Sequence, residues 1–403
     1  MIQAEQLHAR ILQKLDMTRE IEDEELTELI YGVLQEVSRE EHLTLERKTL
    51  LGKELFNAFR KLDLLQEFLE NEEITEIMIN GTQNIFYEKE GRIFQSEKRF
   101  LSREKLEDVI QQIVAGANRL VNEVSPIVDA RLPDGSRVNV VLAPVALDGP
   151  IVTIRKFGKD VLTMQQLIEW NSVSEEVSEF LAVLVETGYN IFISGGTGSG
   201  KTTFLNALSQ YIPGEERIIT IEDNAELKIQ NVPNLVRLEA RNADIEGTGA
   251  ITIRDLIKSA LRMRPDRIIV GEVRSAEAID MLQALNTGHD GSLSTGHANS
   301  PRDMLSRLET MVLMGMELPL PAIQRQIASG IDIIVHLGRM RDKSRKVLEV
   351  TEVLGYDRGE ILLQTLYRYE EEEQAGGRKS GGWKKIHELT HKKKLLAAGY
   401  HTP

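Results

Sequence analysis

The chain has 403 residues, enough for about two to three domains, and it contains no cysteine and carries a formal net charge of −14. The missing cysteines exclude disulfides, thiolate catalysis and cysteine-based zinc modules, and they fit a reducing cytosol. The acidic balance argues against broad, sequence-independent nucleic-acid binding. We expect neither a membrane span nor a secretory signal, because no run of 18 apolar residues occurs and the first residues lack a basic region followed by an apolar core.

Residues 1–60 show only helical spacing of apolar side chains, as at Leu26, Ile30 and Leu34, and this spacing predicts a helical N-terminal module of three helices. The period changes in residues 61–156. Strand-like runs surround one helix that Ser102 could cap, and Gly, Pro and Asp mark the turns between them. This pattern predicts an α+β domain.

Residues 157–162 are predicted to be a linker, and Thr163 with Gln166 matches a capping box at the start of the next helix. Residues 163–369 are predicted to form the next domain, in which strand-like and helical runs alternate after the phosphate loop up to residue 295 and become hairpin-like beyond residues 331–337. The alternation predicts a mostly parallel sheet with helices on both faces. Sheets of this kind bind ligands at the carboxyl ends of their strands. Glycine pairs and a lysine run predict a flexible tail over residues 370–403, with room for a short helix at 383–398.

A phosphate-binding loop lies in the middle of this α/β domain. The apolar run Ile191-Phe192-Ile193 enters the pattern G-x-x-x-x-G-K-T, and a helical pattern leaves it. Glycines allow successive N–H groups to turn onto phosphate oxygens, and the helix N-terminus adds its positive end. Lys201 would reach the β- and γ-phosphates, and the Thr202 hydroxyl would bind Mg²⁺. The predicted nucleotide-binding residues of the loop are Gly195, Gly196, Thr197, Gly198, Ser199, Gly200, Lys201, Thr202 and Thr203.

Two apolar strands of the same domain end in acidic residues. One ends in Glu222 and Asp223, which could support the metal and its waters, with Asp223 at the metal. The other resembles a Walker-B strand in which Gly271 stands where the magnesium-holding aspartate usually sits, so Glu272 is expected to polarise the attacking water. The alternative for each is an ordinary acidic loop at a strand end.

Histidines and arginines supply further candidates. The spacing of His289 and His297, without cysteine or an H-E-x-x-H pattern, argues against zinc and favours a sensor of the γ-phosphate at His297. The alternative for either histidine is a place in the core. Arg131, Arg137 and Arg155 cluster in the α+β domain, where guanidinium groups could bind phosphate or form ordinary surface ion pairs.

In their order along the chain, these stretches resemble the secretion and pilus-assembly traffic ATPases of type II and type IV secretion systems and type IV pili. The motifs that match are the Walker A motif at 195–202, the acidic "Asp box" at 220–226, the Walker B motif at 264–274, which in this family carries glycine instead of aspartate, and the His box at 287–297. The stretches 76–81, 129–139 and 260–266 look most similar to the Tad/Flp-pilus (CpaF-like) subgroup.

This resemblance implies a RecA-like P-loop NTPase domain of the α/β class with a parallel-rich central sheet, preceded by an α+β (PAS-like) domain and a helical leader. It also implies a homohexameric ring that binds ATP and Mg²⁺ between its domains, with Arg131 and Arg137 reaching the γ-phosphate and Arg155 contacting the nucleotide. Such a motor would be cytoplasmic, would associate peripherally with the inner face of the cytoplasmic membrane, and would act on a membrane platform protein to add or export pilin subunits. The absence of a clear match to the C-terminal signature of retraction ATPases favours assembly or export over retraction.

Three other functions remain as alternatives. A RecA-like nucleic-acid translocase is disfavoured by the acidic balance and by the lack of interleaved aromatic and basic residues. A non-hydrolysing, nucleotide-gated assembly scaffold is disfavoured by the presence of Lys201, Thr202 and Glu272. A GTPase is disfavoured because no Asn-Lys-x-Asp sequence occurs.

Overall fold

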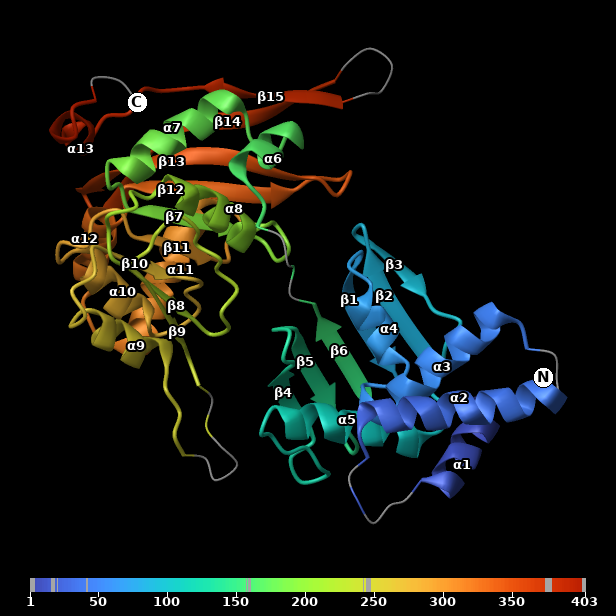
Figure 1. Ribbon diagram of the computed structural model, residues 1–403. Helices are drawn as coiled ribbons and strands as arrows, with labels where there is room; N and C mark the ends of the chain where they lie inside the picture. The colour runs from blue at the N-terminus through green and yellow to red at the C-terminus, as the bar shows by residue number, and fades with distance from the viewer. Residues whose placement is uncertain are drawn as a thin grey trace. The chain divides into compact units, whose positions relative to one another are not determined.

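The computed structural model describes residues 4–15, 19, 21–40, 43–156, 158, 161–241, 243, 248–373 and 379–400. The chain divides into two compact units, residues 1–158 and 159–403 (Figure 1). Of the predicted linker, Phe157, Lys159 and Asp160 lie outside the described residues. No helix in the described parts of the chain has both the length and the apolar composition needed to cross a bilayer.

The first unit begins with the helices predicted from apolar spacing. These are α1 (Ala4–Lys14), α2 (Asp23–Glu40) and α3 (Leu45–Arg60). Their apolar faces meet in a small core that includes Leu7, Ile30 and Leu55. The side chain of Thr44 caps α3 by accepting a hydrogen bond from the backbone N–H of Arg47 at 3.2 Å.

The rest of this unit is an antiparallel sheet covered by helix α5 (Arg103–Gly116), with α4 (Leu65–Glu70) preceding the sheet. Its described strands run in the order β3-β2-β1-β6-β5-β4. They are β1 (Ile74–Asn80), β2 (Asn84–Lys89), β3 (Arg92–Gln95), β4 (Ile127–Arg131), β5 (Arg137–Val141) and β6 (Ile151–Arg155). Ser102 caps α5, as predicted, and the helix packs Leu106 and Ile110 against Val138 and Ile154 of the sheet.

The second unit contains a sheet whose described strands run in the order β15-β14-β13-β12-β7-β11-β10-β8-β9. From β12 to β9 all neighbouring strands are parallel, whereas β12 to β15 pair antiparallel. The strands are β7 (Ile191–Gly195), β8 (Ile218–Glu222), β9 (Leu235–Glu239), β10 (Arg267–Val270), β11 (Leu293–Gly296), β12 (Ile333–Arg339), β13 (Arg345–Asp357), β14 (Glu360–Glu373) and β15 (Lys379–Lys385).

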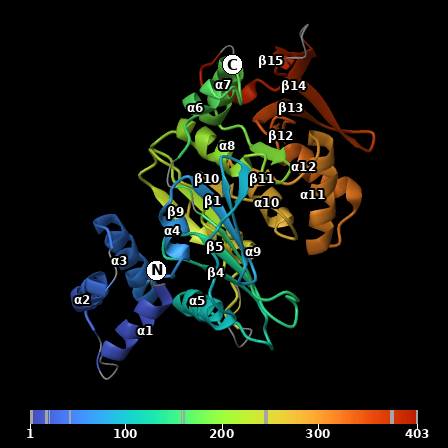
Figure 2. The ribbon, with the colours of Figure 1, turned by 90° about the vertical axis from the view of Figure 1, so that its right-hand side faces the viewer.

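Helices cover both faces of this sheet, because side chains that alternate along the strands feed two separate cores. Ile191 and Ile193 enter one core, and Phe192 between them enters the other. The first core is covered by α6 (Met164–Glu169), α7 (Glu175–Glu186) and α8 (Lys201–Leu208), which is followed by the short 3₁₀ turn Ser209–Tyr211. The second is covered by α9 (Ile253–Ala260), α10 (Ala278–Leu285), α11 (Pro301–Gly315) and α12 (Leu320–Gly330). In Figure 2, α6 and α7 lie apart from α11 and α12.

The prediction of a flexible tail is wrong for residues 379–400. Strand β15 pairs with β14, and Leu395 of the short helix α13 (Lys393–Ala397) is buried in the first core. A buried carboxylate, Glu352, accepts hydrogen bonds from the backbone N–H groups of Thr390 and His391 at 2.8 and 2.7 Å. Gly381 is glycine because a Cβ atom there would collide with the Tyr369 ring, so its glycine reflects close packing instead of flexibility. Gly376 and Gly377 lie outside the described residues.

Candidate functional site

The phosphate-loop sequence connects the end of β7 to the start of α8. Gly198 and Gly200 have φ angles of +69° and +94°, in the left-handed region that glycine adopts without steric cost. Gly195 is required by a close approach, because a Cβ atom there would lie 2.5 Å from the Leu337 carbonyl oxygen and 2.6 Å from Ser199 Oγ. Gly196, Thr197 and Gly198 form the exposed crest of the loop. The loop therefore presents backbone groups and the positive end of α8 to a ligand.

Lys201 is the first residue of α8, and its ammonium group folds back onto the loop. Its Nζ donates to the carbonyl oxygens of Gly195 and Gly196, at 3.2 and 3.1 Å, and to Nδ1 of His297 at 3.1 Å. His297 follows β11, the strand next to β7 in the sheet. Phosphate oxygens bound in the loop would offer the ammonium group stronger acceptors than these carbonyl oxygens.

His297 connects Lys201 to Glu272. Since Nδ1 accepts from Lys201, the imidazole proton lies on Nε2, which is 2.6 Å from Oε1 of Glu272. Burial lowers the pKa of His297, and the charges of Lys201 and Arg274 lower it further, while Glu272 acts in the opposite direction. Because this neutral imidazole contacts both residues, a change in the position of Lys201 can affect Glu272. The structure thus brings three of the predicted site residues together: Lys201 is hydrogen-bonded to His297, and His297 lies against Glu272, whose Oε1 has no hydrogen-bond partner in the described structure.

Arg274 also contacts Glu272, and it is not among the site residues predicted from the sequence. Its Nε donates to Oε2 of Glu272 at 2.8 Å, and a second N–H group contacts the same oxygen. Its other terminal nitrogen lies 3.7 Å from Oδ2 of Asp223. Arg274 therefore joins the acidic ends of β10 and β8. The signal that could have found it is its place two residues after Glu272, at the same carboxyl edge of the sheet.

The side chain of Glu222 is buried at the same edge of the sheet, and only one of its two carboxylate oxygens is hydrogen-bonded. Oε1 accepts from the backbone N–H groups of Glu226 and Leu227, both at 2.9 Å, and Oε2 has no partner within the described structure. Burial raises the pKa of Glu222 to about 7, although those two N–H donors and Arg237 act to lower it. A Cβ atom on Gly271 would lie 2.7 Å from Glu222 Cγ. Glycine replaces the usual Walker-B aspartate because Glu222 fills the space that its side chain would need.

The raised pKa of Glu222 predicts a pH-dependent stability. A carboxyl group that titrates near 4.5 when unfolded and about 7 when folded favours the folded state while protonated, so stability should fall as the pH rises through this window. Glu222→Gln cannot titrate. The free energy of unfolding of this variant should fall less between pH 5 and pH 8 than that of the wild type, by up to about 3 kcal/mol. The measurement is urea unfolding of the full chain, followed by tryptophan fluorescence, because Trp170 and Trp383 both lie in the second unit.

The matched control for this measurement is Glu360→Gln, which changes an exposed carboxylate of the same unit. It should follow the wild type at every pH. Equal pH slopes for Glu222→Gln and the wild type would mean that Glu222 does not titrate differently on folding.

Some residues of this site suit a nucleotide and Mg²⁺. The glycine turn, the N-terminus of α8 and the buried Ser199 Oγ, which has no hydrogen-bond partner in the described structure, suit phosphate oxygens. Thr202 in the first turn of α8, the partly exposed Asp223 and the unpaired Oε2 of Glu222 provide the hard oxygen donors that Mg²⁺ prefers. The other predicted histidine is not part of this set, because Nδ1 of His289 lies 3.1 Å from the carbonyl oxygen of Ala284 near the end of α10.

The predicted arginines form a row in the first unit. Arg137 lies directly opposite Arg131 on one neighbouring strand and directly opposite Arg155 on the other. Directly opposed residues of antiparallel strands project from the same face, and like charges placed in this way destabilise a sheet. Arg131 Nε also donates to the Gly135 carbonyl oxygen at 3.2 Å.

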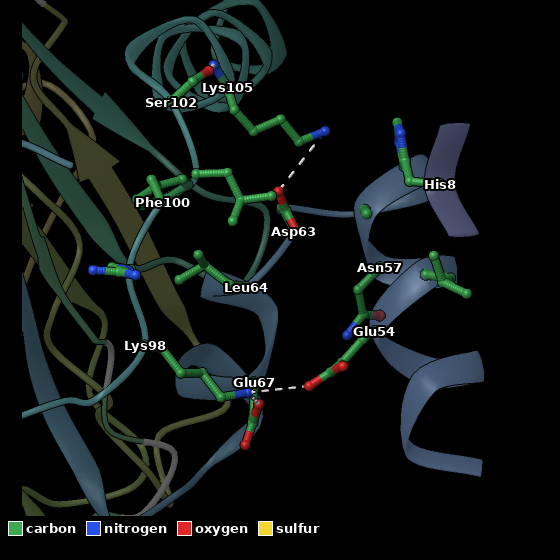
Figure 3. Close-up of a pocket in the computed structure, with 14 residues that line it drawn as sticks. His8, Glu54, Asn57, Asp63, Leu64, Glu67, Lys98, Phe100, Ser102 and Lys105 are labelled. Atoms are coloured by element: carbon green, nitrogen blue, oxygen red, sulfur yellow. Dashed lines mark hydrogen bonds and ion pairs between the residues drawn. The ribbon is translucent and has the colours of Figure 1, made fainter. Parts of the chain in front are cut away.

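A separate cavity of about 460 Å³ lies within the first unit, between α1, α3 and residues 98–105 (Figure 3). Ion pairs cross it: Lys98 lies 3.7 Å from Glu54 of α3 and also contacts Glu67, and Lys105 lies 3.8 Å from Asp63. The helical module and the sheet domain therefore share the walls of one cavity. None of the predicted nucleotide-site residues lines it.

The chain matches the model of the family described as type II/IV secretion system protein over residues 60–402. A putative conjugal transfer protein of Mycobacterium tuberculosis is 33% identical over 310 residues, which cover 75% of this chain and 87% of that protein. The type IV secretion system protein PtlH of Bordetella pertussis is 32% identical over 317 residues, which cover 72% of this chain and 93% of that protein.

Solved structures share the fold. The Legionella pneumophila ATPase DotB matches with a TM-score of 0.52 and 23% identity, over 73% of this chain and 80% of that chain. The pilus retraction motor PilT with bound ADP matches with a TM-score of 0.53 and 18% identity, over 84% of this chain and 86% of that chain. These likenesses confirm the predicted RecA-like P-loop architecture, and the Tad/Flp subgroup stays a prediction. With the family match and the two relatives, they show that this chain belongs to the type II/IV secretion system family of ATPases.

Proposed function

We propose that the protein is an ATP-hydrolysing motor of a type II/IV secretion or Tad/Flp-type pilus-assembly system, and that it works as a homohexameric ring. The observation that carries this proposal is the series of contacts from Lys201 through His297 to Glu272, beside a phosphate loop. It joins the residue that binds phosphate to the residue that would activate water. Names of relatives that refer to conjugal transfer and type IV secretion support a role in export.

In this proposal Lys201, His297 and Glu272 each have a role in hydrolysis. Lys201 and the loop N–H groups hold the phosphates, and Glu272 polarises the attacking water. His297 senses the γ-phosphate: when Lys201 turns to the phosphates, Nδ1 of His297 loses its donor, and with a proton taken up at Nδ1 it can donate to a phosphate oxygen. Thr202 and Asp223, supported by Glu222, would hold Mg²⁺, which neutralises charge on the phosphate oxygens.

The arginine row of the first unit would complete the site. Arg131 and Arg137 would stabilise the charge of the transferring γ-phosphoryl group, and Arg155 would contact the nucleotide. ATP would then favour a closed arrangement of the two units around residues 156–162, and hydrolysis would release it. We propose that this movement acts on an inner-membrane platform protein, from the cytoplasmic side, to add pilin subunits or export a substrate. The ring would be peripherally associated with the membrane.

The experiment that tests this function is steady-state phosphate release from Mg-ATP by the purified chain, with and without DNA, across a salt series. We expect turnover that DNA leaves unchanged, and a particle mass near six chains in the presence of ATP. Strong, salt-sensitive stimulation by DNA would favour the nucleic-acid translocase instead. ATP binding without phosphate release would favour the nucleotide-gated scaffold.

A further inference from the structure

A basic hairpin packs against the phosphate loop from the side opposite the acidic strand ends. Strand β12 lies parallel to β7, and their last residue pair is Leu337 with Gly195. The chain runs on to Arg339, turns, and returns as β13 from Arg345. Cδ of Arg345 lies 3.4 Å from the place that a Cβ atom on Gly200 would take. The hairpin therefore touches the loop near both of its ends.

The arginines of this hairpin have no partner in the described structure. Arg339 lies directly opposite Arg345 in the strand register. Neither side chain forms a hydrogen bond or ion pair with any described residue, and the same holds for Arg341 at the turn. Asp342, the one acid between Arg339 and Arg345, accepts from the backbone N–H and hydroxyl of Ser344 instead. Opposed, unpaired arginines destabilise a hairpin, and an anion bound between them would remove that cost.

The strand order indicates which part of a nucleotide this hairpin would meet. Glu272, His297 and Asp223 follow β10, β11 and β8, all on one side of β7, whereas β12 and β13 lie on the other side (Figure 1). A nucleotide with its γ-phosphate beside Glu272 would run across the loop and turn its α-phosphate toward the opposite side. The stem of Arg345 lies on Gly200, the residue just before the first turn of α8.

We propose that Arg345, aided by Arg339, binds the α-phosphate end of the nucleotide from within the second unit. This proposal rests on the proposed function, since it assumes a nucleotide in the phosphate loop. A guanidinium group suits this task because its planar set of donors can bind two phosphate oxygens at once. Arg345 is remote from the acidic strand ends, so it contributes equally to binding the substrate and the transition state. It sets nucleotide affinity, whereas the arginine row of the first unit sets the rate.

The test is equilibrium binding of ADP to the full-length protein, together with steady-state ATP hydrolysis, for the wild type and Arg345→Ala. The Kd for ADP should rise about ten- to hundredfold, and KM for ATP should rise with it while kcat stays within about twofold. Arg345→Lys should recover part of the affinity, because an ammonium group keeps the charge and loses the planar fork. Arg358→Ala, at the exposed β13–β14 turn, is the matched control and should bind ADP like the wild type.

Two results would overturn the proposal. Wild-type affinity for ADP in both Arg345→Ala and Arg339→Ala would remove the hairpin from the site. A lower kcat with an unchanged KM would place Arg345 at the γ-phosphate. Thermal unfolding separates binding from folding, because removing one of two opposed cations should not lower the melting temperature. A wild-type protein that fails to bind ADP would refute the nucleotide site itself, and this outcome is distinct from a loss confined to Arg345→Ala.

Discussion

Glu272→Gln should bind ATP like the wild type and lose turnover by about 10³-fold. The substitution keeps the shape of the side chain and one carbonyl oxygen, so the contact with His297 can be retained. It removes the negative charge that holds Arg274 and that would polarise the attacking water. In the structure Arg274 engages Oε2 of Glu272, whereas Oε1, which lies 2.6 Å from Nε2 of His297, is buried without a hydrogen-bond partner in the described structure and is the oxygen left to accept from the attacking water. The measurements are equilibrium ATP binding and steady-state phosphate release.

The control for this variant is Glu360→Gln, which neutralises an exposed carboxylate of the same unit and should hydrolyse ATP at the wild-type rate. If Glu272→Gln keeps wild-type turnover, Glu272 is not the base. If the variant also loses ATP binding, the Glu272 carboxylate contributes to holding ATP, and its assignment as the group that activates water would again be wrong.

Arg137→Ala should bind ADP like the wild type and hydrolyse ATP about 10³-fold more slowly. Arg137 is the middle member of the row, opposed by Arg131 on β4 and by Arg155 on β6. The thermal stability of the variant is measured together with its kinetics. A loss of kcat without a loss of thermal stability would separate a catalytic role from a structural one.

Arg137→Lys and Arg92→Ala are the controls for the row. The lysine variant should stay slow, because an ammonium group cannot reproduce two-oxygen contacts with a phosphoryl group. Arg92 lies on β3, at the other edge of the same sheet, and its removal should leave kcat unchanged. Unchanged kinetics in Arg137→Ala would take the row out of the active site.

Local motifs on parallel strands were sufficient to predict most of the candidate site. Lys201, Glu272 and His297 each follow a strand-like run closely, and neighbouring parallel strands end at one edge of the sheet. The sequence could therefore place these side chains near one another, although their catalytic roles stay predictions. The glycine at 271 was recognised as unusual from the sequence, but only the packing of the Glu222 side chain gives its physical reason.

Features that depend on contacts between distant segments could not be predicted from the sequence. The partnership of Arg274 with Asp223 joins two strand ends, and its geometry depends on the order β10-β8 in the sheet. The approach of Arg345 to Gly200 depends on the register of β12 beside β7. The order of the tail could not be predicted from its composition, because glycine allows either a flexible backbone or a close contact.

The most direct test of the central claim is steady-state phosphate release by the wild type and Lys201→Ala, compared at saturating ATP with and without Mg²⁺. Lys201 is hydrogen-bonded to the loop carbonyl oxygens and to His297, and in the proposed function it is also the residue that binds the phosphates. The wild type should release phosphate only when Mg²⁺ is present, and Lys201→Ala should fall to the background rate in both conditions. Equal phosphate release by Lys201→Ala and the wild type would contradict the assignment of this loop as the site of ATP hydrolysis.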